Sequence, residues 1–220
     1  MMLGARTGSW AKSGGGIPSG WVEVEWLKMS SDAYINTGVY VNRDIKTSVR
    51  FSYDGNRRYY QYPIGSSNYN GSIGSFGFFT AALEDWSTAW VSLWNRRNIS
   101  VSWQEGVVYE ASNDGNVFSL KADGVIVFEN FAVQKKSSDF TYPNPISLFG
   151  VLSDSGSIKN VFRGRLYSAF LDDTRGEVRD FVPVRNTTTN EGAMCNILTG
   201  DIYHNAAGTG SFIVGPDKTT

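Results

Sequence analysis

Turn signals recur about every ten residues along this chain, and the segments between them alternate apolar with polar side chains. The segment WVEVEWL, residues 21–27, alternates Trp21, Glu23 and Glu25 with Val22, Val24 and Trp26. The segment KTSVRFSY repeats the pattern and places Val49 and Phe51 on one side. A period of two is typical of a half-buried strand. The rhythm therefore predicts an all-β sandwich or barrel.

Individual turns can be located in the same way. The segment FSLKADGVIVFENF predicts a β-hairpin that turns at Asp123-Gly124, and Asp54-Gly55 and Asp114-Gly115 are further turn signals. The segments ISLFGVL, GRLYSAFLDD and SFIVG are expected to be strands, and the first two are expected to be buried. The 24 glycines and the 14% aromatic content fit this interpretation, because turns need glycine and pleated sheets favour rings.

One segment is ambiguous. In EDWSTAWVSLWNRRNISVSW, Trp86, Trp90 and Trp94 are four residues apart, a spacing that fits one face of a helix or one face of a strand. The β-branched residues favour a strand over 89–103, whereas 82–88 could hold a helical turn.

The length of 220 residues suits a single large domain. We expect residues 1–20 to form a flexible, glycine-rich arm or linker, residues 21–216 the β-sandwich, and residues 217–220 a disordered tail. The arm is either disordered or docks on an oligomer or virion neighbour.

Charge and hydropathy exclude several classes of partner. The net charge is −1 and no basic cluster is present, so nucleic acid is not an expected partner. No apolar stretch approaches the ~18 residues of a membrane helix, so no membrane insertion is expected. The N-terminal residues lack the apolar region of a Sec signal peptide. We therefore expect either association with a virion or export by another route.

The stretch AMCNILTGDIYHNAAGTGSF holds the only cysteine, Cys195, and the only histidine, His204. A catalytic pair would need a thiolate, a base and an orienting group. A lone cysteine is more often a small buried hydrophobe, and a structural zinc ion needs four ligands. We expect a hairpin at Thr199-Gly200-Asp201, with Cys195 in a packing position. Gly208 and Gly210 then let the chain bend into its final strand.

Paired carboxylates are the other catalytic possibility. Sandwich glycosidases mount them on alternate positions of one strand, as in E-x-D-x-E. Glu23 with Glu25, Glu84-Asp85 and Asp172-Asp173 come nearest, and none has the third carboxylate at the right spacing. No catalytic residue, no cofactor and no metal site is therefore expected. The pattern leaves open a structural calcium ion held by loop carbonyls and one or two carboxylates.

Aromatic side chains remain as candidates for binding. Sugar rings offer apolar faces that stack on indole and phenol rings. The sequence-predicted glycan site consists of Trp86, Trp90, Trp94, Tyr59 and Tyr60. The alternative is that these rings fill the core between two sheets.

Three segments resemble a known family. AYINTGV (33–39), GRLYSAFLDDTRGEVRDFVPVRN (164–186) and GAMCNILTGDIYHNAAGTGSF (192–212) are similar to concanavalin A-like, laminin-G-like domains of gut bacteria and their phages. Cys195 and Asn196 stand where that family commonly has an aromatic residue and an aspartate, and Ala206-Ala207 carries an extra residue.

The resemblance implies a two-sheet antiparallel jelly roll, whereas it constrains function weakly, because such domains serve as lectins, glycosidases and assembly modules. Our first hypothesis is a non-catalytic carbohydrate-binding or adhesion module that uses surface aromatics to bind a glycan or protein partner. The second is a structural protein of a phage virion or cell-surface complex. The third is a divergent glycoside hydrolase.

Overall fold

The chain folds as an all-β structure of antiparallel sheets. The computed structural model describes residues 15–54, 61–67, 75–80, 88–93, 95–101, 103–132, 141–152, 156 and 158–219, and for β6, β7 and β8 it describes only the backbone. Its 19 strands confirm the expected fold class, a β-sandwich. The described residues include no helix long and apolar enough to cross a bilayer.

A large sheet of 11 strands forms the first layer, with the main path β11-β10-β9-β4-β15-β16-β17-β18. Three short strands join it off this path: β1 pairs with β16, and β2 pairs with β15 and β19. Its strands are β1 (Trp21–Glu23), β2 (Leu27–Met29), β4 (Lys46–Ser52), β9 (Val108–Asn113), β10 (Val117–Ala122), β11 (Val125–Ala132), β15 (Arg165–Asp172), β16 (Val178–Asn186), β17 (Gly192–Asn196), β18 (Asp201–Tyr203) and β19 (Phe212–Val214).

A small sheet of six strands forms the second layer, in the order β3-β12-β5-β6-β7-β8. A two-stranded ribbon, β13 with β14, packs beside β5. These strands are β3 (Ile35–Asn42), β5 (Gln61–Ser67), β6 (Ser75–Thr80), β7 (Thr88–Leu93), β8 (Asn95–Ser100), β12 (Thr141–Leu148), β13 (Val151–Leu152) and β14 (Ile158–Lys159).

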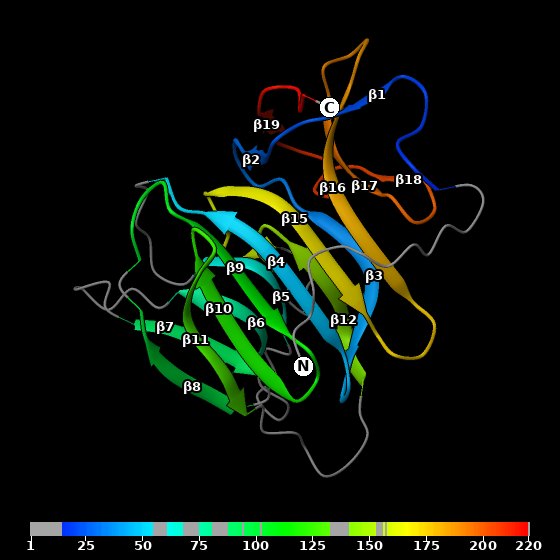
Figure 1. Cartoon of the computed structure of the whole chain (residues 1–220). Helices are drawn as coiled ribbons and strands as arrows, with labels where there is room; N and C mark the ends of the chain where they lie inside the picture. Colours follow the sequence, from blue (N-terminus) through cyan, green and yellow to red (C-terminus); the bar gives the residue numbers. More distant parts are fainter. Residues whose placement is uncertain are drawn as a thin grey trace.

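The main core lies between the two layers. Figure 1 shows β4, β9, β10 and β15 in front, with β5, β6, β7 and β12 in a layer behind them. Strand β3 alternates buried with exposed residues along most of its length, as the period of two requires. At one end of the core the ring of Phe51 meets four others at centroid distances of 5.6–6.0 Å: Tyr53, Trp103, Tyr109 and Phe162.

The predicted hairpin turns are confirmed where the structure describes them. Asp123 and Gly124 both have positive φ, 47° and 79°, as a two-residue turn between β10 and β11 requires. Gly115 (φ 92°) closes the β9–β10 turn and Gly200 (φ 81°) the β17–β18 turn. The Asp54-Gly55 signal falls partly outside the described residues.

The ambiguous tryptophan-rich segment contains two strands rather than one. Strands β7 and β8 pair antiparallel from Thr88↔Ser100 to Leu93↔Asn95. The strand assignment for 89–103 is therefore right in type for residues 89–93 and 95–100, but it missed the reversal between β7 and β8, and Val101 and Trp103 lie outside the strands. The helical turn considered for 82–88 falls on residues outside the description, except for Thr88, which is in β7.

Both ends of the described chain pack against the large sheet. Residues 15–20, here called the N-terminal strap, lie against the β17–β18 hairpin, where the Gly16 amide donates to the Ile197 carbonyl at 2.8 Å. At the other end, Asp217 forms a bridge with Val24. Backbone hydrogen bonds therefore hold residues on the outer side of both expected boundaries, 21 and 216. Residues 1–14 of the expected arm lie outside the described residues.

Candidate ligand-binding face

The sequence-predicted glycan site falls mostly outside the described part of the chain. Tyr59, Tyr60, Trp86 and Trp94 are outside it, and for Trp90 only the backbone, paired with Phe79, is described. The described tryptophans, Trp21, Trp26 and Trp103, are all half-buried. The structure thus neither assembles nor separates the predicted residues, and a site has to be sought among other side chains.

The outer face of the large sheet carries a polar surface at β4, β9 and β15. On β4, Val49 and Phe51 point into the core, so Ser48 and Arg50 face outward. Arg50 is exposed and stands opposite Glu110 of β9. This half of the sheet therefore offers hydroxyl and charged groups to solvent rather than a second apolar face.

A β-bulge in β15 turns an aromatic ring toward the same face. Leu166 pairs with Phe51 and Ala169 with Val49, so two residues of β15 oppose the single residue Arg50. The extra residue is Tyr167, which is half-buried and touches outward-facing side chains. A bulge re-aims a side chain at the cost of local ladder pairing. Here it places Tyr167 beside Arg50.

Tyr167 is held from two sides. The Arg50 guanidinium carbon lies 5.4 Å from the centre of the Tyr167 ring, a cation–π distance. The Tyr167 hydroxyl and Ser52 Oγ are 3.1 Å apart and share a hydrogen bond. Because β15 and β9 flank β4 on opposite sides, Arg50 reaches toward Tyr167 and away from Glu110. The ring is thus positioned before any ligand arrives.

A second cation–aromatic pair lies next to the first. The Arg165 guanidinium carbon is 4.6 Å from the Trp26 ring centre, and Arg165 stands opposite Ser52 in the sheet. Trp26 packs directly on Gly215, where an added Cβ would lie 2.8 Å from the ring. We call the group of Trp26, Arg50, Arg165, Tyr167 and Phe170, the last also half-buried on β15, the arginine–aromatic face.

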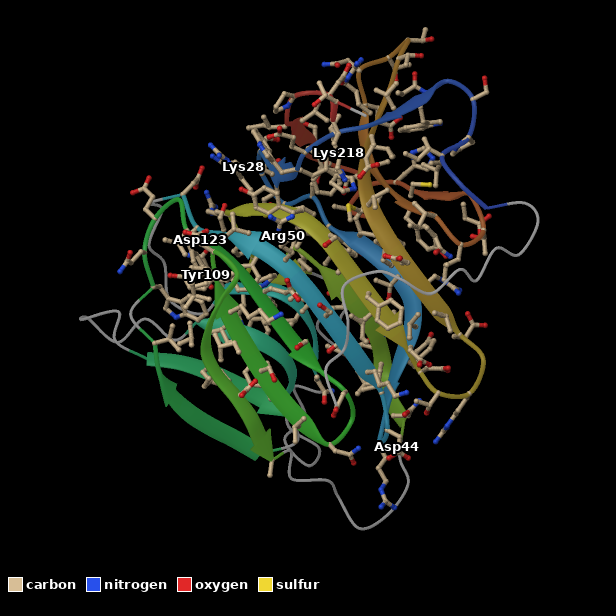
Figure 2. The ribbon with its side chains drawn as sticks, viewed as in Figure 1. Lys28, Asp44, Arg50, Tyr109, Asp123 and Lys218 are labelled. Atoms are coloured by element: carbon tan, nitrogen blue, oxygen red, sulfur yellow. The ribbon has the colours of Figure 1, made fainter. Side chains whose placement is uncertain are left out.

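Among the residues that the structure describes, neither arginine of this face is paired with a carboxylate. Lys28, opposite Arg165, forms an ion pair with Asp54. Neither Arg50 nor Arg165 forms an ion pair with a residue that the structure describes. Figure 2 labels Arg50 on the front sheet with Lys28 near the same end. The face therefore presents two guanidinium groups that form no ion pair with a described residue, beside its rings.

Cys195 and His204 have different partners. Cys195 is fully buried, and its thiol is 3.7 Å from the Gly16 carbonyl of the strap. Burial, and then the charges of Asp201 and Glu23, raise the pKa of this thiol to about 11. The expected packing position is confirmed. His204 is exposed, with its Nδ1 2.7 Å from Glu191 Oε1.

The carboxylate pairs considered from sequence serve turns and ion pairs where they are described. Asp173 accepts the amides of Arg175 and Glu177, and Asp172 accepts the amide of Thr174. Glu23 pairs with Lys218 at 2.6 Å. Within the described ranges, no three His, Cys, Asp or Glu side chains are placed to hold a metal ion. Glu84-Asp85 lies outside those ranges.

Comparison with known proteins adds no family to this picture. No protein-family model matches the chain, and no curated protein matches it. The arginine–aromatic face is therefore the feature of this chain that bears on its function. Sequence patterns missed this face because a strict period of two in GRLYSAFLDD places Tyr167 with Ala169 and Leu171, which are buried. The sequence predicted the strand that carries Tyr167 but not the face to which this residue belongs.

Proposed function

We propose that this chain is a non-catalytic carbohydrate-binding module and that its sugar site is the arginine–aromatic face. The observation that carries the proposal is the pair of half-buried rings, Tyr167 and Phe170, on the outward face of the large sheet. Arg50 and the hydroxyls of Ser48 and Ser168 lie on the same face. Rings, hydroxyls and guanidinium groups in one place match the chemistry of a sugar.

A sugar presents apolar C–H faces and a rim of hydroxyl groups. Aromatic rings bind the apolar faces, and a few well-placed polar groups fix the orientation of the ligand. On this face the Arg50 guanidinium supplies donors, and Ser48 and Ser168 supply hydroxyls that donate or accept. The Tyr167 ring is held by Ser52 and by Arg50, so this side chain loses little entropy on binding.

The test is glycan-array screening followed by calorimetry with the best ligand. Tyr167→Ala should weaken binding by about tenfold or more, in line with the loss of one stacked ring. The matched control is Tyr40→Ala, which removes an exposed tyrosine (46% accessible) from β3 of the other sheet. Glycan binding that survives Tyr167→Ala, or an array with no signal, would overturn the proposal.

A specific observation also favours the second candidate, an assembly protein. Val125, Ile126 and Val127 are 70%, 52% and 43% exposed at the start of β11. Among the described strands β11 pairs on one side only, with β10. An exposed apolar edge strand is a template for pairing with another chain.

Sedimentation velocity separates this candidate from the first. If β11 is an assembly edge, the wild-type chain should self-associate and Ile126→Lys should return it to the monomer. The control is Ile213→Lys, on β19, where the side chain is 46% exposed. A wild-type chain that stays monomeric at high concentration counts against self-assembly through β11.

A further inference from the structure

We infer that the arginine–aromatic face binds acidic glycans, in which Arg50 and Arg165 contact the anionic oxygens of a carboxylate or sulfate group while Tyr167 stacks on a sugar ring. This inference rests on the proposed function and names the class of ligand that the face selects.

The two arginines differ from five other cations of the described chain. Several described cations have carboxylate partners: Lys28 with Asp54, Lys46 with Asp172, Arg179 with Glu177, Arg185 with Asp217 and Lys218 with Glu23. Arg50 and Arg165 have none among the residues that the structure describes, although Glu110 stands opposite Arg50. Their positive charge is therefore left for a ligand.

Aromatic rings pre-organise both guanidinium groups. Arg50 rests against Tyr167 at 5.4 Å and Arg165 against Trp26 at 4.6 Å, so a ring orients each planar guanidinium group. Arg165 is half-buried, and its Nε is buried without a hydrogen-bond partner in the described structure. A partly dehydrated, oriented guanidinium binds an oxyanion more strongly than a freely moving surface cation does.

The spacing of Arg50 and Arg165 suits a single ligand. Arg165 stands opposite Ser52, two residues from Arg50 on β4, so strand geometry puts the two arginine Cα atoms about 8 Å apart. Tyr167 lies in contact with both Arg50 and Ser52. One ligand can therefore meet the ring and a guanidinium group at the same time. The overall charge of −1 makes a nucleic acid the less favoured source of the anion.

The experiment measures binding of the full chain to matched pairs of oligosaccharides. Oligogalacturonides are compared with their methyl esters, which remove the carboxylate charge from the same sugar. Carrageenan oligosaccharides are compared with their desulfated counterparts. A single-stranded DNA oligonucleotide tests phosphate as the anion.

We expect at least one charged oligosaccharide to bind about tenfold more tightly than its neutral counterpart, with an affinity that falls as salt rises. The pair that shows the difference identifies carboxylate or sulfate as the source. Arg50→Gln and Arg165→Gln should each remove most of this preference, because they should weaken binding of the charged oligosaccharide far more than binding of its neutral counterpart. Arg50→Lys should recover part of it, because the charge remains and the planar fork is lost. Lys159→Gln, which removes an exposed cation from β14, is the control. Thermal melting checks that each variant is folded.

Each other outcome counts against a defined part of the argument. Equal affinity for charged and neutral sugars, still sensitive to Tyr167→Ala, overturns the acidic preference and leaves the carbohydrate-binding proposal standing. No binding to any glycan overturns both. DNA binding as tight as the best glycan overturns the choice of a glycan anion.

Discussion

The outer face of the large sheet has two halves that are built in opposite ways. At β16 and β17 it is apolar, with Val182, Val184, Ala193 and Cys195 buried under Ile17 of the strap and Trp21 of β1. At β4 and β15 it carries the arginine–aromatic face. The covered half shows what this sheet needs when its outer residues are apolar: another piece of chain on top of them.

The open half differs in the chemistry that it leaves at the surface. It combines cations and rings on one sheet face, and no described strand packs over the side chain of Arg50, which is exposed. Packing therefore accounts for the covered half, because burying apolar area is favourable by itself. A bound ligand would account for the exposed cations and rings of the open half. The following predictions test this division.

The largest effect should come from placing a carboxylate in the covered half. Val184 is fully buried, so Val184→Asp should lower the free energy of unfolding by about 4 kcal/mol or prevent folding, since the charge has no partner there. The same change in the open half, Ser48→Asp, should cost less than about 1 kcal/mol. Urea denaturation measures both. Similar costs at the two positions would erase the distinction between the halves.

The next effect concerns the strap. A Cβ at Gly15 would lie 2.5 Å from the Ile197 carbonyl oxygen and 2.6 Å from that of Leu198, so Gly15→Val should displace the strap. Labelling of Cys195 by a thiol reagent should then become about tenfold faster, as an opening cost of about 1.4 kcal/mol is removed. Ser19→Val, at an exposed strap position, is the control. Unchanged labelling in Gly15→Val would mean that the strap does not protect the thiol.

A third prediction concerns alkaline pH. The Cys195 pKa of about 11 exceeds the ordinary value of 9.0, so above pH 9 the unfolded chain loses this proton before the folded chain does. The stability that depends on the neutral thiol is complete below pH 9 and is lost as the pH rises through about 11.

Wild type should therefore lose about 2 kcal/mol more stability than Cys195→Ser between pH 8 and pH 11. The difference between the two chains isolates the thiol from Tyr109, whose pKa is also raised, mainly by burial. Denaturant titrations at several pH values provide the measurement. Parallel pH profiles for the two chains would contradict the assignment. Glycan binding should be unaffected by Cys195→Ser, since the thiol lies in the covered half.

The smallest effect should be that of Tyr167→Phe in the open half. The change removes the hydrogen bond with Ser52 Oγ and keeps the ring, so it should cost about 1 kcal/mol or less in stability. Binding should weaken far less than in Tyr167→Ala, and Tyr40→Phe is the stability control. A loss of binding as large as that of Tyr167→Ala would show that the hydroxyl, rather than the ring, makes the contact.

Sequence patterns predicted the parts of the fold that depend on local rules. The turns at Asp123-Gly124 and Thr199-Gly200-Asp201 could be located because positive φ selects a few residue types. The alternation in KTSVRFSY gave the correct inward face of β4, because the side chains of a regular strand alternate strictly. Each of these features depends on only a few neighbouring residues.

The strap and the arginine–aromatic face could not be predicted in this way. Residues 15–20 lack any period, and their place is fixed by contacts with Ile197 and Cys195, which are remote in sequence. Arg50 and Tyr167 meet because of a bulge, which breaks the period of two. Their proximity is a property of strand pairing, which no single segment encodes.

The bulge in β15 also separates residues that core packing constrains from residues on the outer face that it does not constrain. Leu166 and Ala169, on either side of Tyr167 and Ser168, are buried in the core and pair with Phe51 and Val49. Tyr167 and Ser168 are thus free to change without disturbing the partners of Phe51 or Val49. Under the proposed function, substitutions at these two positions would change the ligand that the face binds while the same core is inherited.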